Sequence, residues 1–286
     1  MTHQPTPSID GHTELIVHLG FPTQGFRSPR IYNPYFAAQG IRAVVVPMAC
    51  RADDFPTFLR AVFALDNVRG ALITMPHKVR TVALLDDASP AVHVAGACNA
   101  VRRDARGLLV GEQFDGAGFV RGIQRKGFDV RGCTALVVGA GGVGCAIAAS
   151  LAGAGVGALR LIDENAALAE QLRERLALHY PAIQVSTGSR DPRGCDLVVN
   201  ATPLGMNDGD PLPFDVSLLS ASTFVGEVVM RREVTPLLAA AQARGCRVQV
   251  GTDMLFEQIP AYLEFFGFPS TTPQALRATA RLPADS

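Results

Sequence analysis

The chain has 286 residues, of which 48% are hydrophobic and 18% are charged, as expected for a soluble globular protein with two domains or one large one. Because 26 basic and 26 acidic residues cancel and no apolar run could span a bilayer, we expect no nucleic-acid partner and no membrane association. The N-terminus lacks the regions of a signal peptide, and the six scattered cysteines form no CxxC pair. These features indicate reduced thiols in a cytoplasmic protein, and no metal site is expected.

Strands and helices alternate in the first half of the chain. The expected strands are Glu14–Leu19, Ala43–Pro47 and Val68–Thr74. The expected helices are Arg30–Gln39, Asp53–Leu65 and a third that has Pro76 in its first turn and reaches Leu85. This order predicts a parallel-sheet α/β domain. A hairpin (Cys98–Val101 and Leu108–Gly111) and a helix (Gly116–Arg125), with Asp115 as its plausible N-cap, are expected to follow.

The stretch Thr134–Leu151 predicts a strand, a glycine turn and a helix in direct succession. Glycine permits the sharp turn and lets the backbone approach a pyrophosphate, while the helix N-terminus offers free N–H groups. A second strand, Ala158–Ile162, ends at Asp163, roughly 20 residues beyond the glycines, where a carboxylate would bond the ribose hydroxyls of a dinucleotide. A glycine-rich turn without a ligand is the alternative, and we favour dinucleotide binding.

A second α/β series continues from this stretch. Its expected strands are Ile183–Val185, Leu197–Val199, Phe224–Val229 and Arg247–Val250, and its expected helices are Ala166–Leu178 and Thr235–Ala243. Two further helices, Met254–Phe266 and Pro273–Arg281, are expected to pack back on the first domain.

Lys78 is one of only two lysines in a chain that otherwise uses arginine. A partly desolvated lysine can release a proton, whereas arginine cannot readily do so. A lysine after a strand end, with Asn99 and Asp115 at later element ends, therefore indicates a proton-transfer site. The alternatives are a surface lysine at a helix start and, for Asp115, a simple helix cap.

Together these motifs resemble the shikimate/quinate dehydrogenases over nearly the whole chain. The matching pieces are Gly20-x-Pro22 with Ser28-Pro29 and Asn33, Thr74-Met-Pro-His-Lys78, Gly96-Ala-Cys-Asn99, Gly111-x-x-x-Asp115-x-x-Gly118, Gly139-Ala-Gly-Gly142, Asn200-Ala-Thr-Pro-Leu-Gly-Met206 and Gly251-x-x-Met254-Leu-x-x-Gln258. The resemblance implies an α/β fold with an N-terminal substrate domain (residues 1–114 and 254–286), a Rossmann NAD-binding domain (residues 115–253) and an active site in the cleft.

The resemblance also implies a role for particular residues. Lys78 and Asp115 would be the catalytic pair, with Lys78 relaying the hydroxyl proton and Asp115 orienting the lysine or balancing its charge. The substrate would contact Ser28, Thr74, Asn99, Gln258 and, by our hypothesis, Arg27. The dinucleotide would contact Gly139, Gly141, Gly142, Val143, Asp163, Asn200, Thr202, Leu204 and Gly251.

Several positions depart from the family pattern, and most of them lose a polar group. Phe26 stands at the first serine of a Ser-x-Ser-Pro motif and Leu72 at an asparagine; Phe114 lies in an Asn-Thr pair that is now Gln-Phe, and Met230 stands at a tyrosine. A site that has lost these partners should discriminate against shikimate itself. We hypothesise that the substrate is still an acid, with Arg27 or Arg231 holding its carboxylate; the alternative is that both arginines face solvent.

The cofactor prediction depends on Asp163. The NADP-using branch of the family carries Asn-Arg-Thr after this strand, and this chain carries Asp-Glu-Asn. A carboxylate there would bond a free 2′-hydroxyl and repel a 2′-phosphate, so NAD is predicted over NADP.

We therefore predict an NAD(P)-dependent oxidoreductase that transfers a hydride between nicotinamide and a cyclic hydroxy acid such as shikimate or quinate. The resemblance implies aromatic amino acid biosynthesis; a catabolic role stays open, and use of NAD favours oxidation. The alternative is a ligand-binding or regulatory member of the same fold, which the presence of both Lys78 and Asp115 disfavours. The expected partner is the small-molecule acid, and the expected assembly is a monomer or a homodimer.

Overall fold

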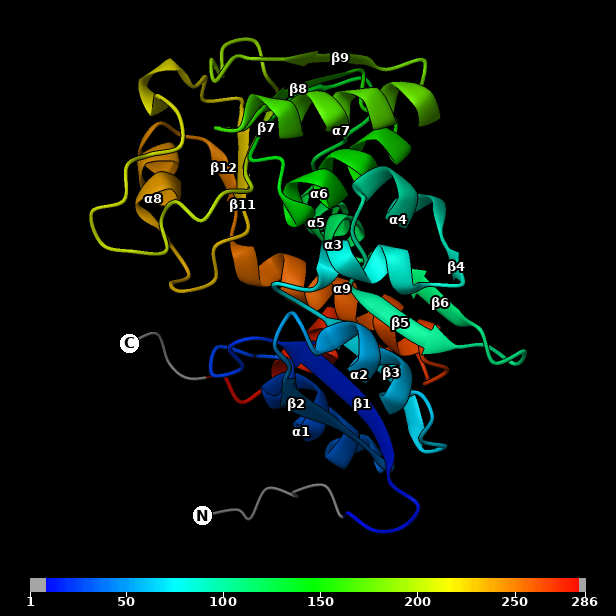
Figure 1. The fold of residues 1–286 in the computed structure, drawn as a ribbon. Helices are drawn as coiled ribbons and strands as arrows, with labels where there is room; N and C mark the ends of the chain where they lie inside the picture. The colour runs from blue at the N-terminus through cyan, green and yellow to red at the C-terminus, as the bar shows by residue number, and fades with distance from the viewer. Residues whose placement is uncertain (1–8, 283–286) are drawn as a thin grey trace. The chain divides into compact units, whose positions relative to one another are not determined.

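The computed structural model describes residues 9–282, and the chain divides into two compact units. Of the described residues, the first unit comprises 9–114 and 259–282, and the second is Asp115–Gln258. The division falls inside helix α9 (Gly251–Phe265), a few residues beyond position 254, where the sequence placed the return to the first domain. Each unit is built on its own six-stranded sheet (Figure 1).

The sheet of the first unit is mixed, which corrects the expectation of a parallel sheet. Its strand order is β2-β1-β3-β5-β6-β4; β1, β2 and β3 are parallel, and β5 is antiparallel to both β3 and β6. The predicted hairpin is confirmed as β5–β6, and it joins this sheet. The elements of the unit are β1 (Glu14–Gly20), α1 (Pro29–Gln39), β2 (Ala43–Ala49), α2 (Phe55–Val62), β3 (Val68–Ile73), α3 (Lys78–Thr81), the 3₁₀ turn η1 (Val82–Leu84), β4 (Asp87–Ala88), α4 (Pro90–Ala95), β5 (Ala100–Arg103), β6 (Leu109–Glu112), the end of α9 and α10 (Pro273–Thr279).

The segment after β3 differs most from the prediction. Pro76 lies in a turn closed by a hydrogen bond from the His77 N–H to the Thr74 carbonyl (2.9 Å), and not in the first turn of a helix. The helix α3 begins only at Lys78 and gives way to η1, so the expected continuous helix to Leu85 is wrong. Helix α4, which was not predicted, begins behind Ser89, whose side chain accepts a hydrogen bond from the Val92 N–H.

Strand alternation divides the side chains of this sheet between two faces. Val17 and Leu19 of β1 pack in one core cluster with residues of α2, including Phe55 and Leu59. On the opposite face, a Cβ added to Gly70 of β3 would lie 2.3 Å from the ring of Phe266, so the chain after α9 covers this side. The helix α10 also belongs to this unit, and the Arg281 N–H donates to the Arg30 carbonyl (2.8 Å). The C-terminal segment thus belongs to the first unit from Ile259, whereas Met254–Gln258 of the predicted helix belong to the second unit.

A side chain of α1 forms hydrogen bonds with the backbone of the edge strand β2. The Asn33 amide donates to the Val45 carbonyl (3.1 Å) and accepts from the Val45 N–H (2.7 Å). An edge strand otherwise leaves such backbone groups unpaired and open to another chain. Asn33, which the sequence showed only as part of a family motif, therefore has a structural role in this unit.

The sheet of the second unit is parallel throughout, with the order β12-β11-β10-β7-β8-β9. Counted from its own first strand, this is the Rossmann order 3-2-1-4-5-6 read from the other edge, with its switch point between β7 and β10. The predicted Rossmann fold is confirmed. Its elements are α5 (Asp115–Arg125), β7 (Thr134–Val138), α6 (Gly142–Gly153), β8 (Ala158–Ile162), α7 (Ala166–His179), β9 (Gln184–Thr187), β10 (Leu197–Asn200), η2 (Val216–Leu218), β11 (Phe224–Glu227), α8 (Pro236–Ala243), β12 (Arg247–Gln249) and the start of α9.

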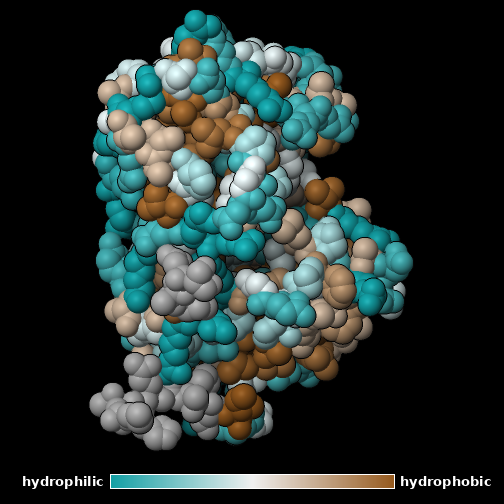
Figure 2. Space-filling view, turned by 90° about the vertical axis from the view of Figure 1, so that its left-hand side faces the viewer, coloured by the Kyte–Doolittle hydropathy of each residue, from teal (hydrophilic) through white to brown (hydrophobic). Residues whose placement is uncertain are grey.

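The described residues contain no helix that is both long and apolar enough to cross a membrane. On the face in Figure 2, hydrophilic residues cover most of the surface and hydrophobic residues occur in small groups. All six cysteines are free thiols and all are buried.

Candidate functional site

The first unit gathers several predicted residues at one edge of its sheet. The strands β1 and β3 are parallel, so their carboxyl ends meet at this edge, where ligands of α/β sheets usually bind. Thr74 directly follows β3, and a Cβ added to Gly20, the last residue of β1, would lie 2.4 Å from its methyl group. Lys78 starts the next helix, and its carbonyl accepts from the Cys98 N–H (2.9 Å), beside Asn99. The structure thus brings Thr74, Lys78 and Asn99 together.

Asn99 is fully buried and only partly satisfied. Its Oδ1 accepts from the Phe114 N–H (2.9 Å), whereas its Nδ2 has no hydrogen-bond partner among the described residues. The Phe114 ring packs edge-on against Tyr262 (centroids 4.8 Å apart) and Phe265 (5.7 Å). A buried amide donor without a partner is costly, so Nδ2 is available to a ligand oxygen.

Ser28 and Arg27 lie at the start of α1. Ser28 is buried at the N-cap position, but its side chain makes no capping hydrogen bond, which leaves the hydroxyl for another partner. Arg27 is half-buried, and its guanidinium has no ion pair within the part of the chain that the structure describes. Arg231, the other candidate for a carboxylate, is exposed in the second unit.

His18 carries no expectation from the sequence, yet it lies on this side of the sheet. Its ring stacks on that of Phe26, with centroids 4.0 Å apart and planes 26° apart. Burial, with a smaller contribution from the nearby Lys78 cation, lowers the pKa of His18 to about 3. The one sequence signal was a histidine within the otherwise apolar strand Leu15–Leu19.

In the second unit, the glycine turn after β7 is held by close backbone contacts. Gly139 has φ +105°, and a Cβ there would lie 2.8 Å from the Ala201 carbonyl oxygen. A Cβ at Gly144 would lie 1.9 Å from the Gly139 oxygen, which no side chain permits. Gly141 is the N-cap of α6 and has no side chain to cap the helix, so the first amides, from Gly142 and Val143, stay open to an anion.

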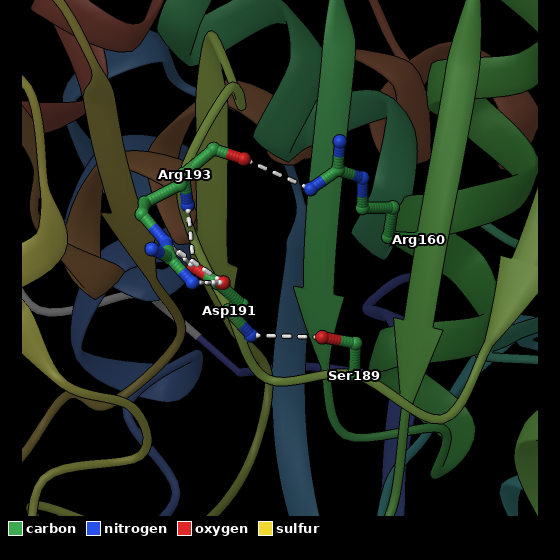
Figure 3. Close-up of polar contacts among 4 residues, drawn as sticks. All are labelled: Arg160, Ser189, Asp191 and Arg193. Carbon is green, nitrogen blue, oxygen red and sulfur yellow. Dashed lines mark hydrogen bonds and ion pairs between the residues drawn. The ribbon is translucent and has the colours of Figure 1, made fainter.

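Asp163 follows β8 and faces this turn. Its Oδ2 accepts from the Ala140 N–H (2.7 Å) and its Oδ1 from the Asn165 N–H (2.9 Å). A carboxylate has about four acceptor positions, so two remain for ribose hydroxyls. Arg160, which lies in β8, donates a hydrogen bond to the carbonyl of Arg193 (2.9 Å) in the loop after β9 (Figure 3).

On the other side of the switch point, Asn200 ends β10 and orders the turn that follows. Its Oδ1 accepts from the backbone N–H and the hydroxyl of Thr202 (3.1 and 2.6 Å), and its Nδ2 donates to the Leu204 carbonyl (3.0 Å). The turn therefore lies against the glycine turn through Ala201. These residues fit a dinucleotide: an open helix N-terminus, a carboxylate beside the turn and a rigid loop across the switch point.

Glu227 is a second buried polar group that the sequence did not single out. It ends β11 in register with Asn200, and its carboxylate oxygens have no hydrogen bond of ordinary geometry from the described residues. Burial raises the pKa of Glu227 to about 7, although the nearby Thr235 and Asn200 side chains partly offset this. An acidic residue in the apolar strand Phe224–Val229 was the available signal.

Asp115, Gln258 and Gly251 also lie in the second unit. Asp115 is buried and is the first residue of α5. The sequence predicted it as the N-cap, which would lie one residue before the helix. A Cβ at Gly118, one turn along α5, would lie 2.8 Å from Cβ of Gln258, whose Oε1 has no partner among the described residues. Gly251 starts α9 so close to the end of β11 that a Cβ would lie 2.2 Å from the Val229 oxygen.

The comparisons with known proteins agree with this arrangement. A family model of the shikimate dehydrogenase substrate binding domain matches residues 19–101, and a ThiF family model matches residues 123–170, around the glycine turn. A shikimate dehydrogenase (NADP(+)) of Rubrobacter xylanophilus is 38% identical over 256 residues, which cover 88% of this chain and 90% of that protein.

Two solved structures with bound ligands are similar. A quinate dehydrogenase from Corynebacterium glutamicum in complex with NAD is 32% identical with a TM-score of 0.84, covering 93% of this chain and 98% of that one. A shikimate 5-dehydrogenase from Listeria monocytogenes in complex with shikimate and NAD is 27% identical with a TM-score of 0.87, covering 94% and 97%.

A Rossmann sheet with an open glycine turn and a second α/β unit with a lysine at its sheet edge, together with these relatives, identify the class of the protein as a nicotinamide-dependent oxidoreductase. The chain belongs to the shikimate dehydrogenase family, which confirms the predicted resemblance.

Proposed function

We propose that this protein catalyses reversible hydride transfer between NAD and a cyclic hydroxy acid, with Lys78 and Asp115 as its catalytic residues. The observation that carries the proposal is the sheet edge of the first unit. There, Lys78 starts a helix beside Asn99, a buried amide with a free donor. This neighbourhood supports the proposal that Lys78 transfers the proton and that Asn99 binds a ring hydroxyl.

A bound nicotinamide would supply the hydride acceptor for oxidation of a ring alcohol to a ketone. The protein has to remove the hydroxyl proton and hold the ring. We assign proton removal to Nζ of Lys78 and ring contacts to Asn99 Nδ2 and the Ser28 hydroxyl. Asp115 is buried and is the first residue of α5, and we assign it the second catalytic role.

The substrate is proposed to be an acid other than shikimate, with Arg27 as the carboxylate ligand. Arg27 has no ion pair among the described residues and is adjacent to Phe26, where the family serine is lost. A guanidinium can hold a carboxylate with two parallel hydrogen bonds. An Arg27→Ala enzyme with an unchanged KM for the acid would contradict this assignment.

NAD is proposed as the preferred cofactor, although curated relatives are named as NADP-dependent. Asp163 lies beside the Gly139 turn and keeps acceptor positions for ribose hydroxyls. Its negative charge would repel a 2′-phosphate. The test is the ratio of kcat/KM for NAD to that for NADP, in the wild type and in Asp163→Asn, with Asp191→Asn as the matched control. A wild type that prefers NADP would refute the preference.

The catalytic assignment is tested by NAD reduction with quinate and shikimate side by side. Lys78→Ala should lower kcat by ~10²–10⁴-fold, the range typical of a lost general acid–base group. Lys126→Ala is the matched control, because the only other lysine pairs with Asp253 (3.0 Å) in the second unit. Tight NAD binding without turnover of any hydroxy acid would instead support a binding or regulatory protein.

The compartment and the assembly are part of the proposal. Six free, buried thiols are consistent with a reducing compartment such as the cytoplasm. A monomer or a homodimer is proposed, and light scattering at working concentration would decide between them.

A further inference from the structure

We infer that His18 is a further substrate-contacting residue, one that selects cyclic hydroxy acids bearing fewer ring hydroxyls than shikimate or quinate. The inference rests on the proposed function and names the substrate class of the same site. His18 lies in β1 in register with Leu72 of β3, and strand alternation puts both on the face of Gly20 and Thr74.

The side chain of His18 is buried but not satisfied. The residue is only 7% exposed, and Nδ1 has no hydrogen-bond partner within residues 9–282. A core histidine normally has its ring nitrogens paired, so an unpartnered one at a sheet edge that holds the catalytic lysine indicates a missing ligand atom. Because the ring is neutral at working pH, it can accept or donate one hydrogen bond but offers no charge to a carboxylate.

Two of the departures from the family pattern meet at this histidine. Phe26, which replaces a serine, stacks on the imidazole with a 4.0 Å centroid separation, and Leu72, which replaces an asparagine, is its registered neighbour. The hydroxyl and the amide of the family pattern are thus replaced by an aromatic ring and a leucine side chain beside His18. We call this surface of Phe26, His18 and Leu72 the aromatic wall.

The composition of the aromatic wall sets the substrate class. A ring that turned several hydroxyls toward it would leave them buried without partners, which strongly disfavours binding. A ring acid that presents apolar carbons and one polar substituent would satisfy Nδ1 and bury its carbons against Phe26 and Leu72. 3-Hydroxycyclohexane-1-carboxylate has this chemistry, whereas shikimate and quinate carry additional hydroxyls.

The experiment measures binding as well as turnover, so that it does not depend on the proposed reaction. The three acids are titrated by calorimetry into the wild type, His18→Leu and His18→Asn, and kcat/KM is measured at saturating NAD. His93→Leu is the matched control, since His93 is exposed on α4. NAD affinity and the melting temperature of each variant report whether the fold is intact.

We expect the wild type to bind 3-hydroxycyclohexane-1-carboxylate more tightly than shikimate or quinate. His18→Leu should bind this acid about tenfold or more weakly, with a higher KM and an unchanged kcat. His18→Asn should recover part of the affinity, because an amide can place a polar atom near the Nδ1 position. Phe26→Ser with Leu72→Asn should move the preference toward shikimate.

Unchanged affinity for every acid in a folded His18→Leu protein would overturn the inference, as would a wild type that binds none of the acids or prefers the polyhydroxylated ones. Weaker acid binding in His18→Leu without turnover by the wild type would support the inference and refute the proposed function alone.

Discussion

Replacing Glu227 with glutamine should make the protein more stable at neutral and alkaline pH but not in acid. Glu227 is fully buried, and burial raises its pKa from 4.5 to about 7. The native state therefore holds this proton more tightly than the unfolded chain does. Glutamine keeps the size and polarity of the protonated acid and cannot ionise.

The sign and size follow from proton linkage. Below the unfolded pKa of 4.5 both states are protonated and the side chain carries no penalty; between 4.5 and about 7 only the unfolded chain loses the proton, so stability falls as pH rises. At ~1.4 kcal/mol per pKa unit, the full penalty is about 3 kcal/mol, and roughly 2.5 kcal/mol of it develops between pH 5 and pH 8.

The assay is urea unfolding followed by circular dichroism at pH 5, 6, 7 and 8. The free energy of unfolding of the wild type should fall relative to Glu227→Gln by the stated amount across this range. Glu174→Gln, at an exposed position on α7, is the control and should differ from the wild type by a constant. A constant difference between Glu227→Gln and the wild type would refute the reasoning, because it would mean that Glu227 titrates alike in both states.

Three further substitutions test the glycine turn and the edge of strand β2. Gly144→Ala should weaken NAD binding at least ~10-fold and also lower the melting temperature, because its Cβ would lie 1.9 Å from the Gly139 oxygen. Gly141→Ala, whose Cβ meets nothing within 4 Å, should weaken NAD binding with the melting temperature unchanged; equal affinity of both variants and the wild type by fluorescence titration would argue against a dinucleotide at this turn. Asn33→Ala should lower the free energy of unfolding by ~1–3 kcal/mol, since Val45 loses both hydrogen bonds at the β2 edge, and urea denaturation with no change would contradict that role.

The sequence predicted the second unit better than the first. Short apolar strands alternating with helices leave few arrangements for a parallel sheet, and the glycines mark the turn at Gly139 directly. In the first unit, nothing local in Cys98–Gly111 showed that the hairpin would join the sheet beside β3, which makes the sheet mixed. The prediction of a helix with Pro76 in its first turn is wrong because Thr74–His77 form a turn at this place.

The candidate site was predicted from motifs, whereas two buried polar residues that the structure reveals stand in no motif. Lys78 and Asn99 stand in recognisable patterns, whereas His18 and Glu227 are single polar residues inside apolar strands. Their neighbours become known only from the strand register, which pairs His18 with Leu72 and Glu227 with Asn200. The pairing of Phe26 with His18 is likewise a contact across a loop, which no spacing in the sequence predicts.

The six buried thiols make it possible to measure the opening of each unit by the rate at which its cysteines are alkylated. Cys50 and Cys98 belong to the first unit, and the second unit holds Cys133, Cys145, Cys195 and Cys246. Because a thiol reagent reacts only with an accessible thiolate, and burial raises the pKa of Cys98 to about 12, alkylation has to wait for the surrounding structure to open. Peptide-resolved alkylation rates would thus report the opening of the first unit and of the second unit separately, in the native chain and without any engineered probe.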